Sequence, residues 1–410
     1  MNKKIVVIGG GPAGMMAAGR AGELGAEVLL LEKNNALGIK LLITGKGRCN
    51  LTNNSYEPRD LVQQFVRGSF LFSSLYRFGV EDTINFFESR GLKTKIERGN
   101  RIFPLSDRSQ DVLNLLQQYL VDNQVKIKTK AEVKKVIKRD NKIEKIILEN
   151  GEEVKGDIYI IATGGKSYPA TGSSGEAFEW LRALGHKVVK PRPALVPIIL
   201  QESFISDLEG LSLKNVEITV FKDNKKIDSR FGEALFTDKG MSGPIILDMS
   251  REIGENLPGD LELKIDFKPA LSFEELDKRV QNDFSENNNK LFRNSLDKLL
   301  PKKLIPIIIA LSGIDKEKKV NLVTREERKK LIHLLKEFTC QIKDLESFKR
   351  AIITAGGVDL GEVDPRTCQS KLIENLYLVG EVLDLDGPTG GYNLQVCWST
   401  GYVAGEAVST

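Results

Sequence analysis

The first thirty residues alternate between continuous apolar runs and a segment of small residues. Residues 4–8 and 26–31 are apolar runs of strand length, and residues 12–24 between them are rich in alanine and glycine. Continuous apolar runs are typical of strands that are buried on both faces of a parallel sheet. Two parallel strands need a crossover connection, which is normally a right-handed helix. The pattern therefore predicts a β-α-β unit at the start of the chain.

The pattern changes twice before residue 165. Residues 60–122 have mainly helical spacing, whereas residues 125–161 contain short strands separated by Asp-Asn and Asn-Gly turns. A second continuous apolar run at residues 157–162 ends in Thr163-Gly164-Gly165. We therefore expect a helical region, a β-meander and then another buried strand.

Three prolines between residues 191 and 197 mark a further boundary. Residues 213–267 are strand-rich, and residues 272–335 return to helical spacing, with capping-box sequences that begin at Ser272 and Thr324. The other predicted elements are two strands and a last helix, at residues 348–354, 376–379 and about 391–407.

These changes predict an α/β fold in which a nucleotide-binding domain is interrupted by a β-rich insertion. The discontinuous domain covers residues 1–190 and 350–410, and the insertion covers residues 191–270 and 336–349. A small helical domain at residues 271–335 is carried by the insertion.

The composition excludes several kinds of chemistry. The chain of 410 residues has 37 glycines but only two histidines and four cysteines. A His-based catalytic triad or a His-ligated metal is therefore disfavoured, and His186 and His333 are expected at the surface. The cysteines form no C-x-x-C pair, which argues against zinc, an iron–sulfur cluster or a redox dithiol. We predict no metal site.

The apolar runs and the cysteines also bear on location. No window of the sequence reaches the roughly eighteen apolar residues of a membrane span. The isolated cysteines suit a reducing compartment as free thiols. The sequence therefore predicts a cytoplasmic protein without a membrane partner.

Residues 126–145 form the most basic part of the chain, with nine Lys/Arg against three acids, a local charge of +6. Such a run can be a nucleic-acid patch or one solvated face of a sheet. Apolar residues alternate with the charges, and no aromatic residues for base stacking accompany them. With a formal net charge of only +4 for the whole chain, the sheet face is favoured and a nucleic-acid partner is disfavoured.

The first motif with chemical meaning is Gly9-x-Gly11-x-x-Gly14, between the first predicted strand and helix. Gly9 permits a tight turn, Gly11 lets the backbone approach a diphosphate, and Gly14 allows close packing of helix against sheet. The helix N-terminus adds a favourable dipole for the diphosphate. Glu32 ends the next strand, where a carboxylate can bind a ribose diol. The motif in this context predicts a bound dinucleotide.

Two later motifs favour FAD over NAD. Ala162-Thr163-Gly164 ends a second buried strand, and residues 375–381 end a third with Gly380-Glu381. This arrangement resembles the FAD domains of the glutathione-reductase-like class, in which the last motif usually carries Asp and contacts the flavin ribityl chain. Here Glu381 is one methylene longer. The helix that begins near Gly390-Gly391 is placed to direct its dipole at the flavin ring.

Five ordered motifs narrow the resemblance to one family. They lie at residues 43–53, 235–244, 354–358, 380–384 and 390–395. Together they resemble the bacterial flavoproteins known as aminoacetone oxidase-like or NAD(P)/FAD-dependent oxidoreductases. The resemblance spans the whole chain. It implies a Rossmann-type FAD-binding domain interrupted by a β-barrel-like insertion that carries a small helical domain.

The resemblance also implies a set of FAD-binding residues. Those expected at the ADP half are Ala13, Glu32, Lys33 and the backbone of Val133, beside the glycines of the first motif. Lys40 and Leu41 are expected along the path from the diphosphate to the flavin, and the residues expected to approach from the other strands are Thr163, Gly164, Gly380, Glu381, Asn393 and Leu394. Arg48 is a further candidate because its donors suit a flavin or an anionic substrate group.

The catalytic residues are not identified by the sequence. Arg48 and Asn50 lie in the glycine-rich loop of residues 45–53, for which a structural and cofactor-positioning role is favoured over direct catalysis. Tyr392 is a candidate proton donor, with packing as an equal alternative. Cys49 has no second cysteine a few residues away, which argues against a disulfide-reductase mechanism.

The sequence thus predicts an FAD-dependent oxidoreductase that passes a hydride between a small organic substrate and flavin N5. The resemblance leaves two directions open, which are oxidation of a small amine with dioxygen and reduction of an activated C=C bond with NAD(P)H. No second GxGxxG motif supports a separate nicotinamide domain. The alternatives are an RNA-associated flavoprotein and a non-catalytic flavin-binding protein.

Overall fold

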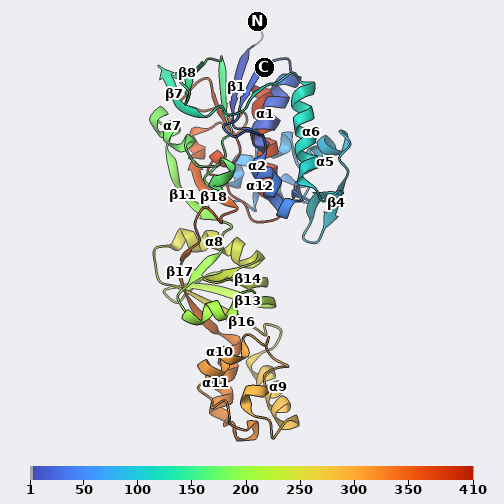
Figure 1. Ribbon diagram of the computed structural model, residues 1–410, viewed down its shortest axis with the longest axis vertical. Helices are drawn as coiled ribbons and strands as arrows, with labels where there is room; N and C mark the ends of the chain where they lie inside the picture. The colour runs from blue at the N-terminus through green and yellow to red at the C-terminus, as the bar shows by residue number, and fades with distance from the viewer. Residues whose placement is uncertain (1–2, 410) are drawn as a thin grey trace. The chain divides into compact units, whose positions relative to one another are not determined.

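The computed structural model describes residues 3–409, which form two compact units (Figure 1). The first unit contains the described residues up to Pro193 and those from Phe348 onward, and the second contains Ala194–Ser347. The second unit holds both a β-barrel and the helical segment 271–335. The division into three domains therefore stays a prediction.

A parallel five-stranded sheet lies at the centre of the first unit, with the strand order β19-β10-β1-β2-β6. Its strands are β1 (Lys4–Ile8), β2 (Glu27–Leu31), β6 (Lys126–Lys128), β10 (Ile158–Ile161) and β19 (Leu376–Leu378). β1 pairs in parallel with β2 and β10, so the predicted β-α-β unit is confirmed.

Helices and a small meander cover the two faces of this sheet. One face packs against α1 (Pro12–Glu23), α6 (Ser109–Asp122) and α12 (Tyr392–Ala407) through residues such as Ile5 and Val7. The other face packs against β7 (Val133–Arg139), β8 (Lys142–Leu148), β9 (Glu153–Val154) and α7 (Ala177–Leu184) through Val6 and Ile8. Alternate residues of one strand point to opposite faces, so a strand covered on both sides must be apolar throughout.

The prediction of a helical region at residues 60–122 is partly wrong. This segment contains α3 (Pro58–Val62), α4 (Phe72–Arg77) and α5 (Val80–Glu88), but it also contains the hairpin β4 (Thr94–Glu97) and β5 (Arg101–Pro104). β5 pairs with β3 (Thr52–Asn53) to complete a three-stranded sheet. The strand expected at residues 348–354 is displaced to β18 (Ile353–Val358), which pairs with β11 (Val188–Ala194).

The second unit is built on a closed barrel of six strands with the order β12-β15-β14-β13-β16-β17. They are β12 (Ile198–Leu200), β13 (Ser212–Lys222), β14 (Lys225–Phe236), β15 (Gly240–Ser242), β16 (Leu261–Asp266) and β17 (Phe338–Leu345). The helices are α8 (Pro244–Asn256), α9 (Phe273–Glu286), α10 (Ile305–Ser312) and α11 (Arg325–Lys336). The capping boxes predicted at Ser272 and Thr324 begin α9 and α11. The predicted α/β fold with a barrel insertion is confirmed.

The basic run begins in β6 of the central sheet and continues along the exposed meander of β7 and β8, as the sheet-face interpretation predicted. Its lysines pair with acids from neighbouring strands and turns. The pairs are Lys126–Glu27, Lys128–Glu152, Lys134–Glu149, Lys142–Glu374 and Lys145–Glu153. These pairs neutralise much of the local charge of +6. Among the helices formed by residues 3–409, none has the length and apolar content needed to cross a membrane.

His186 is not at the surface as predicted, because it is only 3% exposed. Its Nδ1 lies 3.0 Å from Glu362 Oε2, and its Nε2 lies 2.9 Å from Ser370 Oγ. Ser370 Oγ also accepts hydrogen bonds from the backbone N–H groups of Leu372 and Ile373. The residue therefore fastens the end of α7 to the segment that precedes β19.

This burial predicts a loss of stability in acid. Desolvation lowers the pKa of His186, although the contact with Glu362 opposes the shift. The unfolded chain therefore binds the proton more readily, so stability falls as the pH drops through about 6.5 toward the folded-state pKa. Urea unfolding of the wild type and of His186→Gln between about pH 7.5 and about pH 5 checks this. Parallel stability profiles for the two proteins would contradict it.

Candidate active site

The turn between β1 and α1 is closed by contacts that only glycine permits. A Cβ at Gly9, where φ is 107°, would lie 2.5 Å from the carbonyl oxygen of Ala162. A Cβ at Gly14 would lie 1.9 Å from the carbonyl oxygen of Gly9. A Cβ at Gly11 would meet nothing within 4 Å. Gly9 and Gly14 thus serve packing, whereas Gly11 keeps open space beside the N-terminus of α1.

Glu32 lies at the end of β2 and is only 8% exposed. Its Oε2 accepts a hydrogen bond from the N–H of Gly10 at 2.8 Å, and its Oε1 accepts two from Asn34. The side chain of Lys33 instead reaches Glu176 at 2.6 Å. Val133 begins β7 near this place, because the N–H of Ala131 donates to the carbonyl of Glu32.

The ends of β1, β10 and β19 lie at one edge of the sheet because these strands are parallel. Thr163 and Gly164 follow β10, and the Oγ1 of Thr163 is buried without a hydrogen-bond partner among the described residues. Gly380 follows β19 with φ 72°, and a Cβ there would lie 2.8 Å from the Cβ of Ala13 in α1. The strand-end residues predicted from separate motifs are therefore brought together here.

Glu381 is held by three protein partners. Its Oε2 accepts a hydrogen bond from Lys40 Nζ at 2.7 Å, and its Oε1 accepts from Ser167 Oγ and Thr354 N, both at 2.8 Å. Lys40 belongs to α2 (Ile39–Ile43), whose Leu41 is fully buried in the core. Both carboxylate oxygens are thus engaged, and Glu381 joins α2, the segment after β10 and β18.

Removing this charge is expected to destabilise the protein. Glu381→Gln leaves the partly buried ammonium of Lys40 without its carboxylate, and an ammonium in such a position is costly. We expect a loss of about 1–3 kcal/mol in the free energy of unfolding. Urea denaturation of the variant and the wild type, both without added FAD, measures it. A difference below about 0.5 kcal/mol would show that the pair is worth no more than a surface ion pair.

The turn before α12 is shaped by Gly390 and Gly391, which have φ of 125° and 102°. Asn393 fastens this turn, because its amide donates to the carbonyls of Gly387 and Pro388 and accepts from the N–H of Gly387. The Tyr392 ring meets Phe65 edge-on, with centroids 6.3 Å apart. Leu394 is partly buried against the core of the first unit.

The loop of residues 45–53 is attached to the same turn. Asn53 Nδ2 donates to the carbonyl of Gly390 at 3.1 Å, and Thr52 Oγ1 donates to Gln395 Oε1 at 2.6 Å. The Oδ1 of Asn50 is buried and lacks a partner among residues 3–409. Arg48 is directed to Glu97 and Asp107 on the neighbouring hairpin segment.

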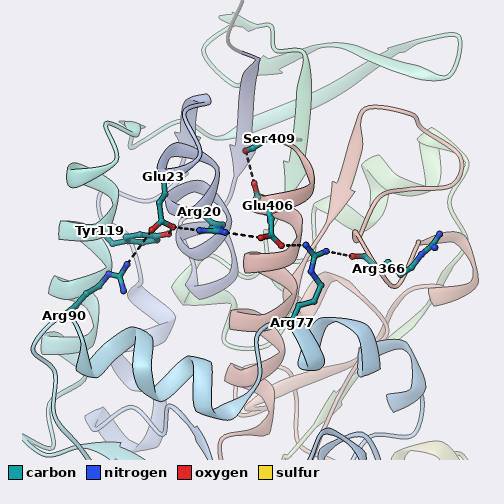
Figure 2. Close-up of polar contacts among 9 residues, drawn as sticks. Arg20, Glu23, Arg77, Arg90, Tyr119, Arg366, Glu406 and Ser409 are labelled. Carbon is teal, nitrogen blue, oxygen red and sulfur yellow. Dashed lines mark hydrogen bonds and ion pairs between the residues drawn. The ribbon is translucent and has the colours of Figure 1, made fainter.

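The two helices that begin at this edge pack directly on each other. Gly401 and Gly405 of α12 leave no room for a side chain, because their Cβ atoms would lie 2.5 and 2.6 Å from carbonyl oxygens of Ala13 and Ala17 in α1. Toward their C-terminal ends, Glu406 of α12 accepts hydrogen bonds from Arg20 of α1 and from Arg77 (Figure 2). Close packing and ion pairs thus hold the two helix N-termini at a fixed separation.

A charged network extends from this helix pair to α6. Glu23 accepts hydrogen bonds from Arg20 at 2.9 Å and from Tyr119 at 2.8 Å, and Arg90 approaches its second oxygen (Figure 2). Burial acts against the Glu23 carboxylate, but these contacts outweigh it and lower the pKa of Glu23. Burial raises the pKa of Tyr119, so the phenol keeps its proton and donates a hydrogen bond to the Glu23 carboxylate.

Some residues of this region were not singled out in the sequence. Ser167 and Gln395 are examples, and Gln395 is 1% exposed with partners on β3, on α12 and at the start of α5. Thr354 and Gln395 lie inside two of the five family motifs, at residues 354–358 and 390–395, but the motifs alone do not assign a role to either side chain. Nothing in the sequence around Ser167 points to Glu381.

The residues at this edge fit FAD. The N-cap residues of α1 and α12 are Gly11 and Gly391, which have no side chain that could cap the helix, so these N-termini suit anionic atoms. The buried Thr163 Oγ1 and Asn50 Oδ1 make no hydrogen bond to the described residues, and the space beside Gly11 is open. The diphosphate would be held at α1, the ribityl chain near Gly380, and the ring near α12. The individual contacts of the predicted residues stay predictions.

Comparison with known proteins agrees with this fit. A family model described as the HI0933-like protein Rossmann domain matches residues 3–407. The chain is 34% identical over 415 residues to the 3-dehydro-bile acid delta(4,6)-reductase of Clostridium scindens, with 99% of each chain covered. It is 30% identical over 402 residues to the ribosomal RNA dihydrouridine synthase of Escherichia coli, with 98% of this chain and 96% of the relative covered.

Solved structures support the fold. The 3-ketosteroid-Δ4-(5α)-dehydrogenase of Rhodococcus jostii RHA1 has a TM-score of 0.53 at 15% identity, and the match covers 100% of this chain and 97% of that one. A flavocytochrome c3 fumarate reductase has the same TM-score at 14% identity and is covered over 78% of its length.

The fold, the site and these relatives together define an FAD-dependent oxidoreductase. Within that class, the chain belongs to the HI0933-like family, because the family model matches nearly its full length. The narrower resemblance to aminoacetone oxidase-like proteins is not confirmed by these relatives.

Proposed function

We propose that this protein reduces a C=C bond conjugated with a carbonyl group in a small organic substrate, with NAD(P)H as the electron source. The observation that supports this most is the 34% identity over 99% of both chains with a reductase of the Δ4,6 double bonds of a 3-dehydro-bile acid. The E. coli relative is named for dihydrouridine, which is uridine with two hydrogens added across a C=C bond. Neither name denotes an amine oxidase.

In this proposal FAD supplies the hydride from N5, and the protein supplies orientation, electrostatics and a proton. With FAD bound, the flavin would pass two electrons from NAD(P)H to the substrate, which would gain a hydride at the β-carbon and a proton at the α-carbon. The α12 N-terminus stabilises negative charge beside it. Asn50 Oδ1 has no partner within residues 3–409, so it would be available to accept a hydrogen bond from a ring N–H.

Tyr392 Oη is the proposed proton donor. The residue is the first of α12, and its ring is held edge-on by Phe65. Tyr392→Phe keeps this packing and removes only the hydroxyl. We expect unchanged FAD content and NAD(P)H oxidation, but about a hundredfold slower substrate reduction, as is common when a general acid is lost. Equal rates for the two proteins would assign Tyr392 to packing alone.

Anaerobic stopped-flow mixing tests the proposed direction. The FAD-loaded protein is mixed with NADH or with NADPH, and flavin absorbance is followed before and after adding a compound with an enone group. Rapid bleaching by one nucleotide, followed by return of the colour with the enone, supports the proposal. Slow bleaching by both nucleotides, with rapid bleaching by small amines, would replace it with the oxidase direction.

A uridine in RNA is the second candidate substrate. It is favoured by the relatives from E. coli and Haemophilus influenzae, which are 30% and 28% identical over 98% of this chain. The pairing of lysines in the 126–145 run with nearby acids works against it. RNA binding measured against salt concentration decides, because phosphate contacts give a steep loss of affinity with salt. Absence of binding at low salt would remove this candidate.

A further inference from the structure

The loop that precedes β3 adopts a backbone conformation that most residues avoid. Gly45, Lys46, Gly47 and Cys49 all have positive φ, of 56°, 60°, 84° and 61°. Two of these are not glycine, so the left-handed conformation is unfavourable for them. Backbone of this kind persists only where the surrounding structure enforces it, and it is found often at functional sites.

Arg48, within this loop, is held by a group of mostly charged side chains from the β4–β5 hairpin and the residues that follow it. Arg48 Nη1 lies 3.0 Å from both carboxylate oxygens of Glu97 and 3.3 Å from Asp107 Oδ1. Its guanidinium lies over the Phe103 ring, 4.0 Å from the centroid. Lys95 closes the group, at 2.5 Å from Asp107 and 3.3 Å from Glu97. We call these five residues the Arg48 clamp.

The clamp is more than an isolated surface ion pair. Isolated exposed pairs contribute little, whereas networks of several charges can contribute more. The hydrogen bond to Glu97 is the main cause that raises the pKa of Arg48, and the same contact lowers the pKa of Glu97. The backbone supports it, because the N–H of Leu51 donates to the carbonyl of Ile102 at 2.8 Å.

The clamped loop leads directly to groups at the cofactor edge. Asn50 follows the last left-handed residue and carries the buried, unpartnered Oδ1. Asn53 bridges the carbonyls of Gly99 in the hairpin and Gly390 before α12. The hairpin of β4 and β5 is therefore connected both to the loop and to the turn at which the flavin ring is expected.

The geometry points to Arg48 as a positioning residue that acts through Asn50, and not as a ligand of the flavin or the substrate. In this inference the Arg48 clamp maintains the left-handed backbone on both sides of Arg48, so that the side-chain oxygen Oδ1 of Asn50 faces the cofactor. It rests on the FAD site and not on the proposed substrate, so FAD binding and flavin potential test it even if the proposed reduction is wrong.

A double-mutant cycle of Arg48→Gln, Glu97→Gln and the combined variant tests it. The FAD dissociation constant is measured by quenching of flavin fluorescence, and the flavin midpoint potential by dye equilibration. We expect each single variant to bind FAD about tenfold more weakly, with potentials shifted in the same direction. The combined variant should show the same affinity and potential as each single variant, because either substitution alone already disrupts the clamp.

The control is Glu153→Gln, which removes an exposed ion pair with Lys145 on the meander and should change neither quantity. Thermal unfolding of each apoprotein separates a local effect from loss of the fold. If Glu97→Gln binds FAD as the wild type does while Arg48→Gln does not, Arg48 is itself a ligand and the inference fails. If both single variants retain wild-type affinity and potential, the clamp does not position the loop and the inference fails as well.

Discussion

A Gly11→Ala variant is expected to fold normally and to lose FAD. The added Cβ meets no protein atom within 4 Å, and φ at this residue is −81°, which alanine adopts without strain. The open space beside it adjoins the N-terminus of α1, where the backbone must approach the diphosphate. We expect FAD binding to weaken about a hundredfold or more, equivalent to about 2.7 kcal/mol. Fluorescence titration measures the binding, and thermal unfolding of the apoprotein measures the fold.

Gly14→Ala provides the contrast. Its Cβ would lie 1.9 Å from the carbonyl oxygen of Gly9 and 3.2 Å from the Cβ of Ala162. Backbone must move to admit it, so this variant should lose both stability and FAD. Equal destabilisation by the two substitutions, or wild-type FAD affinity in Gly11→Ala, would contradict the assignment of packing to one glycine and cofactor approach to the other.

The central sheet was predictable because its information is local. The apolar runs of β1, β2 and β10 are continuous, and the turn after β1 needs glycine at fixed positions. The tight turn at Asp223-Asn224 between β13 and β14 depends likewise on two adjacent residues. Both have positive φ, a conformation that Asp and Asn tolerate better than most residues. The residue pattern alone predicted a β-rich insertion, and only the family resemblance implied a barrel, because β12 pairs with β17 across more than a hundred residues.

The β4–β5 hairpin was missed for a physical reason. Its strands have four residues each, and Lys95, Glu97 and Arg101 interrupt the apolar pattern. Its third strand, β3, lies some fifty residues earlier in the chain. Such a sheet is stabilised by non-local pairs, including that of Arg48 with Glu97, which no window of sequence reveals.

The site could be predicted as a set of residues but not as a set of contacts. Lys40, Glu381 and Asn393 were singled out for the cofactor, yet each also has protein partners far away in sequence or across a turn. Asn393, for example, uses its whole amide on the turn of Gly387 and Pro388. A polar group is left for the cofactor only if the protein itself does not already satisfy it, and this depends on every hydrogen bond around the site. Among the residues that the structure describes, this leaves Thr163 and Asn50 with unpartnered oxygens at the predicted FAD site.

Gly401→Ala is expected to separate α12 from α1 and to destabilise the protein. Its Cβ would lie 2.5 Å from the carbonyl oxygen of Ala13 and 3.1 Å from the Cβ of Met16. Alanine normally favours a helix over glycine by about 1 kcal/mol, but overpacking against backbone costs about 1–3 kcal/mol. The backbone carbonyl of Ala13 cannot move aside as a side chain can, so the cost of overpacking should exceed the gain in helix propensity. We expect a net loss of about 1–2 kcal/mol in urea unfolding, together with weaker FAD binding.

Gly254→Ala in α8 is the matched control, since it is another helical glycine with a close neighbour. Its Cβ would lie 2.9 Å from the Cδ1 of Leu345, which is the free end of a flexible side chain and can rotate away. Helix propensity should therefore decide here, and the variant should be as stable as the wild type or up to about 1 kcal/mol more stable. FAD affinity should fall in Gly401→Ala alone, because only that substitution displaces the two helix N-termini at the cofactor edge. A loss of stability without a loss of FAD affinity in Gly401→Ala would show that the spacing of the two helices does not set the FAD site.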